Sequence, residues 1–187
     1  MDKRFGEAER LLAGAIGATD VECMANVEVR EFVRQMDRLE RMVTGAKAAG
    51  IGELARKDAW NDGSARSAAD WVAQETGTSW GAAGAVVALG EELRALPTTA
   101  TALREGRISG TQAALVAKAA TVDPHSEYRM LELAQRTSVK ELQAASDRIR
   151  ATESGALADQ QAAIHRTRYL RTWVDREGAF RIDARMT

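Results

Sequence analysis

The chain has 187 residues, enough for one domain or for one domain with a small appendage. Hydrophobic residues make up 45% of the chain but aromatic residues only 5%, so alanine-rich helices with close contacts are favoured over an aromatic β core. Glycine and proline are too few for collagen or proline-rich disorder, and a net charge of −1 does not indicate a globally basic nucleic-acid binder.

The first part of the chain predicts two helices. The first is short and ends near Gly17, and Thr19 with Glu22 forms a capping box after it. The second covers residues 27–48, where apolar residues recur at three- and four-residue steps. These residues are Val29, Phe32, Val33, Met36, Leu39, Val43 and Ala46. We expect Gly50 to end this helix, which is long enough to pair antiparallel within the chain or across a dimer.

Residues 51–96 predict three further helices separated by turn signals. A short helix within 51–63 should end in the turn at residues 61–63, Asn-Asp-Gly. Ser64 or Ser67 then caps a helix that Gly77 ends. Thr78 or Ser79 starts the next helix, which we expect to reach Leu96.

That last helix carries a stripe of small residues along one side. Its members are Gly81, Gly84, Ala85 and Ala88. Such a stripe lets a second backbone approach closely, and packing must offset the cost of about 1 kcal/mol for each helical glycine. We therefore take the four positions as a candidate interface.

The segment from 97 to 166 is expected to be helical throughout. Pro97 suits the first turn of a helix over 98–105, which ends at Gly106. Capping boxes at Ser109 with Gln112 and at Ser138 with Glu141 start two later helices. Further helices are expected over 126–136 and 156–166.

Two stretches, 78–93 and 102–116, are similar to pieces of a helix-turn-helix. In the second, the helix that would enter a DNA groove offers only Gln112 and Lys118 to bases or phosphates. A generic helix–helix corner is the favoured interpretation.

Near the end of the chain, the spacing of apolar residues changes from a helical to a strand-like period. Residues 168–174 and 180–186 combine β-branched, aromatic and alternating residues around a polar turn at 175–178, which predicts a β-hairpin. A lone hairpin is marginal in water and leaves an open edge. It could pack on the helices or pair with another chain, but we expect it to continue into a region not present here.

The expected fold class is mainly α, a multi-helix bundle of seven to nine helices with a short C-terminal β-hairpin. The expected divisions are 1–25, a short helix and linker; 26–167, the helical domain; and 168–187, the hairpin.

The residues that could carry chemistry form no catalytic arrangement. Cys23 is the single cysteine, so no intramolecular disulfide and no cysteine-based zinc site can form, and we expect a buried or neutral thiol. His125 and His165 are expected to be a turn residue and a helix C-terminal cation. The carboxylates Glu91, Glu92, Asp58 and Asp62 are typical of solvated faces. No glycine-rich phosphate loop occurs.

No membrane span or signal peptide is apparent, so a soluble cytoplasmic protein is expected. The basic side chains gather towards the C-terminus, since residues 136–187 hold ten basic and seven acidic residues. Clustered arginines can bind phosphates. The candidate DNA contacts are Lys140, Arg148, Arg150, Arg166, Arg168 and Arg171. The alternative is a solvated face balanced by Glu141, Asp147, Asp159 and Asp175.

Two runs of sequence carry a family resemblance: residues 62–71 followed by 76–79, and residues 93–103 leading to 106–113. Together they resemble the actinobacterial domain of unknown function 222, a repeat-element family found upstream of HNH endonuclease domains. The resemblance runs from about residue 25 to the end. It implies a neighbouring nuclease whose ββα site uses His and Asn residues with a divalent cation. No residue of that module is visible here, so no catalytic, cofactor or metal residue is assigned, and the cation is expected only in the absent module.

Two functions follow as hypotheses. The first is a non-catalytic helical N-terminal domain of an HNH endonuclease-like protein, which associates with DNA or positions the absent nuclease. The alternative is a helical protein-interaction or homodimerisation module that does not bind nucleic acid. The expected partners are DNA or a second copy, with no membrane and no small-molecule substrate, and the chain alone is not expected to be an enzyme.

Overall fold

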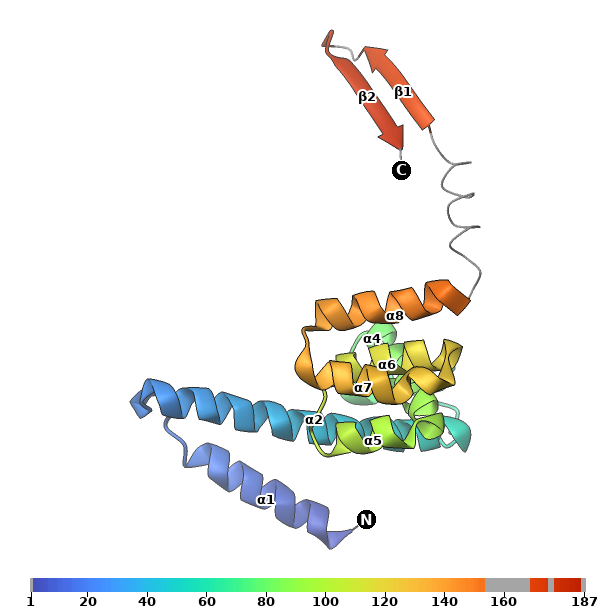
Figure 1. Cartoon of the computed structure of the whole chain (residues 1–187). Coiled ribbons are helices and arrows are strands. Elements are labelled where there is room, and N and C mark those ends of the chain that lie inside the picture. Colours follow the sequence, from blue (N-terminus) through green and yellow to red (C-terminus); the bar gives the residue numbers. More distant parts are fainter. Residues whose placement is uncertain (1, 154–168, 175–176, 186–187) are drawn as a thin grey trace. The chain divides into compact units, whose positions relative to one another are not determined.

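The computed structural model describes residues 2–153, 169–174 and 177–185, and it divides the chain into two compact units, Met1–Glu40 and Arg41–Thr187. The described residues confirm a mainly α fold with a C-terminal hairpin (Figure 1). The helices are α1 (Lys3–Gly17), α2 (Asn26–Arg56), α3 (Ala68–Thr76), α4 (Trp80–Glu92), α5 (Pro97–Arg104), α6 (Gly110–Val122), α7 (Glu127–Arg136) and α8 (Val139–Glu153). Three short 3-10 turns are η1 (Val21–Cys23), η2 (Leu93–Ala95) and η3 (Pro124–Ser126). The domain divisions expected from the sequence stay predictions.

The first unit holds α1, η1 and the beginning of α2. Asp2 caps α1 by accepting a hydrogen bond from the Arg4 N–H, and Asp20 caps η1 by accepting from Glu22. The expected capping box at Thr19 is wrong, because the Thr19 hydroxyl donates back to the Ala15 carbonyl at 2.7 Å. No residue between 2 and 40 is buried.

Helix α2 continues through Gly50 to Arg56, so the expected end at Gly50 and the separate helix after it are wrong. The reason is tertiary packing: Ala48, Ile51 and Gly52 are all buried. That burial offsets the helical cost of glycine. The chain leaves the helix only at Asp58, whose φ of 51° is left-handed.

The predicted caps of the middle helices are confirmed. Ser67 accepts from the Asp70 N–H at 3.1 Å to begin α3, and Gly77 ends it with a left-handed φ of 64°. Ser79 caps α4, which ends at Glu92 and not at Leu96, because the chain tightens into η2. The Ser109–Gln112 capping box begins α6 as expected.

Helix α6 lies at the centre of the second unit. It contacts α4, α5, α7 and α8, and Figure 1 shows it alongside α7 and α8. Six of its residues are buried: Ala113, Leu115, Val116, Ala117, Ala119 and Ala120. The Gln112 amide donates to the Ala134 carbonyl at 2.6 Å. The exposed strip of α6 is narrow and carries one basic residue, Lys118, so a helix–helix corner stays the favoured interpretation of 102–116.

Glycines set the distance between helices of the second unit. A Cβ placed on Gly52 would lie 2.5 Å from the Gly90 carbonyl oxygen, and one on Gly45 would lie 2.8 Å from the Arg104 nitrogen. Helix α2 therefore approaches α4 and α5 backbone to backbone, which only glycine permits.

The C-terminal hairpin is confirmed by its two strands, β1 (Tyr169–Val174) and β2 (Phe180–Arg185). They pair antiparallel in a register from Tyr169 opposite Arg185 to Val174 opposite Phe180. Gly178 in the turn has a left-handed φ of 85°. The helix expected over 156–166 lies outside the described residues.

Candidate functional site: a cleft between two helices

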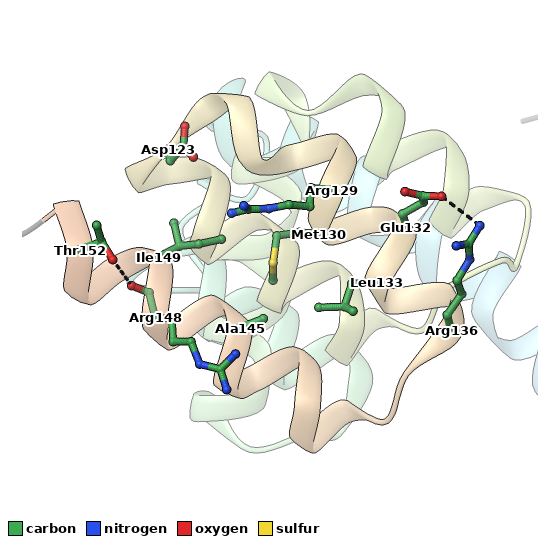
Figure 2. A pocket seen from close by; sticks show the side chains of 10 residues that line it. All are labelled: Asp123, Arg129, Met130, Glu132, Leu133, Arg136, Ala145, Arg148, Ile149 and Thr152. Atoms are coloured by element: carbon green, nitrogen blue, oxygen red, sulfur yellow. Dashed lines mark hydrogen bonds and ion pairs between the residues drawn. The ribbon is translucent and has the colours of Figure 1, made fainter.

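A cleft of about 610 Å³ opens between α7 and α8, and we call it the α7–α8 cleft (Figure 2). Its lining combines an apolar floor with a charged rim. The lining residues are Asp123, Arg129, Met130, Glu132, Leu133, Arg136, Ala145, Arg148, Ile149 and Thr152. The volume falls in the range of ordinary ligand pockets.

Local capping fixes where α8, the second helix of the cleft, begins. The Glu141 carboxylate accepts from the Ser138 N–H at 3.0 Å and from the Ser138 hydroxyl at 2.9 Å, while the same hydroxyl accepts from the Glu141 N–H. These bonds confirm the predicted capping box and hold the pKa of Glu141 below its usual value. Helix α8 therefore begins at Val139, directly after α7 ends at Arg136.

The floor of the cleft is aliphatic. Met130 is fully buried, and Leu133, Ala145 and Ile149 are half-buried against the main core. These residues belong to both α7 and α8, so the apolar strip is continuous across the cleft. An apolar side chain placed on this strip would exclude water from it.

The rim carries three arginines and two carboxylates. Glu132 and Arg136 form an ion pair at 2.9 Å, and Asp123 accepts from the His125 N–H at 3.0 Å. Within residues 2–153, no ion pair engages Arg129 or Arg148. In Figure 2 the Arg129 side chain reaches across the cleft towards Ile149, away from the Glu132–Arg136 pair. The cleft therefore keeps two cationic groups for an incoming anion.

Of the candidate DNA contacts whose side chains the structure describes, Arg148 and Arg150 do not share one face of α8. Arg148 and Arg150 stand two positions apart on α8, which places them on opposite sides of it. Arg148 lines the cleft, and Arg150 lies 3.6 Å from Asp147. Lys140 is exposed in the first turn of α8.

The other three candidate DNA contacts are described only in part. Arg166 and Arg168 lie outside the described residues. Arg171 belongs to β1, opposite Asp183 in the register, and its side chain is outside the described part.

The stripe of small residues on α4 is largely open to solvent. Gly81, Ala85 and Ala88 are exposed, and Gly84 is half-buried. A Cβ on Gly84 would lie an ordinary 4.0 Å from the Cβ of Ala69. Within the described chain, the close approach on α4 occurs at Gly90, and the interface role of the stripe stays a prediction.

Two of the remaining candidate residues can be placed. The sequence predicts a buried or neutral thiol at Cys23; the residue is exposed, so the buried alternative is wrong, because η1 belongs to the unit that buries none of the residues described between 2 and 40. His125 is exposed in η3, as a turn residue should be. His165 lies outside the described residues. The described residues contain no group of three or more His, Cys, Asp or Glu that could hold a metal ion.

Sequence reasoning missed Arg129 and Arg136, because it weighed only the basic residues after position 136. The available signal was their seven-residue spacing on α7, which places both on one side of a helix. That spacing says nothing about the facing helix, so the cleft itself became visible only from the fold.

The fold and the cleft define a mainly helical bundle domain with a mixed apolar and cationic cleft. The family described as Domain of unknown function (DUF222) matches residues 30–185, and the chain belongs to that family. No curated protein and no solved structure matches it. Among the described residues, no helix combines the length and apolarity that crossing a membrane requires.

Proposed function

We propose that this chain is the non-catalytic helical domain of an actinobacterial, cytoplasmic HNH endonuclease-like protein, and that it positions the nuclease module on DNA. The observation that carries the proposal is the family match, which extends without interruption through the bundle and the hairpin. The motifs at 62–79 and 93–113, which resemble the domain that precedes HNH nucleases, support the association with a nuclease.

The DNA contacts are expected mainly from the residues after α8. On α8 itself, Lys140, Arg148 and Arg150 are balanced by Glu141, Asp147 and Glu153. The surplus positive charge of the C-terminal region therefore comes largely from Arg166, Arg168 and Arg171 and their neighbours.

A gel-shift experiment with duplex DNA at low and moderate salt tests the proposal. Binding should weaken steeply with salt, because neutralised phosphates release counterions. Changing Arg166, Arg168 and Arg171 together to alanine should abolish the shift. The matched control changes three exposed arginines of α2, Arg30, Arg34 and Arg38, and should leave it intact. Absence of any shift at low salt removes the DNA role.

One observation favours homodimerisation as a second function. No residue between 2 and 40 is buried, and apolar side chains lie exposed there: Leu11 is 70% exposed and Val27 is 73% exposed. Short helices are marginal without a packed apolar face. Light scattering at high concentration tests this function, and a strictly monomeric protein would count against it.

A further inference from the structure

We propose that the α7–α8 cleft binds an acidic, amphipathic segment of a partner protein, with the partner's apolar side chains on the floor and its carboxylates at Arg129 and Arg148. This docking role goes beyond positioning on DNA, and it uses a surface that belongs entirely to residues 123–152.

The floor determines which part of the ligand enters. Leu133, Ala145 and Ile149 are half-buried and lie over fully buried Met130, so they offer an apolar surface already supported by the core. An amphipathic helix places side chains every third or fourth residue into such a groove. Burying them removes apolar surface from water on both partners.

The rim determines the charge of the ligand. Three arginines against Asp123 and Glu132 give the lining a net charge of +1 (3 − 2). The Glu132 carboxylate is already held by Arg136, whereas Arg129 and Arg148 carry no ion pair within residues 2–153. Carboxylates of the ligand complement those two guanidinium groups, which select an acidic segment over a basic one.

The same lining argues against nucleic acid as the occupant of the cleft. Single-stranded nucleic acid binds where bases stack on aromatic side chains, and none of the ten lining residues is aromatic. A phosphate backbone carries no apolar side chains and would leave the aliphatic floor uncovered. A peptide with both apolar and acidic side chains satisfies both surfaces.

Fluorescence anisotropy with designed peptides tests the proposal on the full chain. The probe is a short labelled peptide with leucine at every third or fourth position and glutamate between. One control peptide replaces glutamate with lysine, and another replaces leucine with alanine. We expect saturable binding of the first peptide only. No binding of the leucine–glutamate peptide, or equal binding of the lysine peptide, overturns the proposal.

Variants locate the binding site in the cleft. Arg129→Ala should weaken binding about 1.5-fold to fivefold, the usual range for one exposed ion pair. Arg129→Glu should weaken it further and should gain affinity for the lysine peptide. Ile149→Asp should abolish binding, with circular dichroism to verify that α8 is retained. The matched control is Arg150→Ala, which removes the same charge from the opposite side of α8. Equal effects of Arg129→Ala and Arg150→Ala would refute a cleft site.

Separate variants test DNA binding and peptide binding, so either proposal can be refuted without the other. Arg129→Ala should leave the DNA shift unchanged, and the triple change at 166, 168 and 171 should leave peptide binding unchanged. Arg148 belongs to both candidate sites and is left intact in both sets of variants.

Discussion

Glu92 at the end of α4 is a carboxylate in a partly buried position, where its negative charge is poorly solvated. Partial burial raises its pKa above the usual value, although Lys118 acts in the opposite direction. A raised pKa in the folded state means that the ionised carboxylate destabilises the fold at neutral pH. Stability should therefore rise as the pH falls from that raised pKa towards the usual value.

Replacing Glu92 with glutamine should remove this penalty. We expect a gain of about 0.5 kcal/mol or less at pH 7, because Glu92 is only partly buried and solvent still screens its charge. The gain should vanish below the usual glutamate pKa, because Glu92 of the parent protein is then protonated in both the folded and the unfolded state. Urea unfolding at two pH values measures it, and an equal gain at both would contradict the electrostatic cause.

Glu127 joins two helices through one oxygen. It accepts from the Thr99 N–H at 3.0 Å and from the Thr99 hydroxyl at 2.9 Å, and Thr99 is fully buried. The first donor is one of the unpaired N–H groups at the start of α5. The carboxylate thus caps a helix far from it in sequence.

Glu127→Ala should cost about 1–3 kcal/mol, because it leaves two buried donors unpaired. Glu127→Gln retains an acceptor oxygen and should cost less. Thermal unfolding of the two variants side by side measures the difference. Identical melting temperatures would show that water replaces the carboxylate.

At the scale of elements, the contact of α2 with α4 depends on paired glycines. A Cβ on Gly90 would lie 2.8 Å from the Gly52 nitrogen, whereas a Cβ on Gly81, in the same helix, would meet no atom within 4 Å. The two positions therefore separate packing from helix propensity within a single helix.

Gly90→Ala should destabilise the fold by about 1–3 kcal/mol through overpacking. Gly81→Ala should instead stabilise it by up to about 1 kcal/mol, because alanine is the better helix former. Chemical denaturation of both variants gives the comparison. A stabilised Gly90→Ala protein would mean that α2 and α4 do not touch as described.

Elements with local signals were predictable, and those set by distant packing were not. The Ser67 cap, the Gly77 stop and the Ser109–Gln112 box depend on atoms within a few residues, so the sequence pattern sufficed. The passage of α2 through Gly50 depends on contacts with another helix, which no local pattern contains. The cleft is a similar case, since its rim combines Arg129 with Arg148 from the next helix.

At the scale of the whole molecule, hydrogen-bonded carboxylates set the response to acid. The pKa of Asp62 is lowered by hydrogen bonds from Ser64, that of Asp70 by the Arg66 N–H, and that of Glu141 by Ser138. A lowered pKa in the folded state means that these groups stabilise the fold above their usual values. The stability they contribute is lost as the pH falls through their folded values.

The midpoint of urea unfolding should therefore decrease on acidification below about pH 4. Changing Asp62 and Asp70 together to asparagine should flatten that decrease. The measurement is a series of unfolding curves between neutral pH and pH 3. A steeper acid dependence in the double variant would assign the effect to other groups.

The exposed position of Cys23 has a practical consequence for every measurement of assembly. A solitary accessible thiol can oxidise against its counterpart in another molecule and form a covalent pair. Such a pair would imitate genuine self-association in light scattering unless a reductant is present. Used deliberately, the same sulfur accepts a single maleimide dye, so energy transfer between differently coloured molecules can report on self-association without an introduced cysteine.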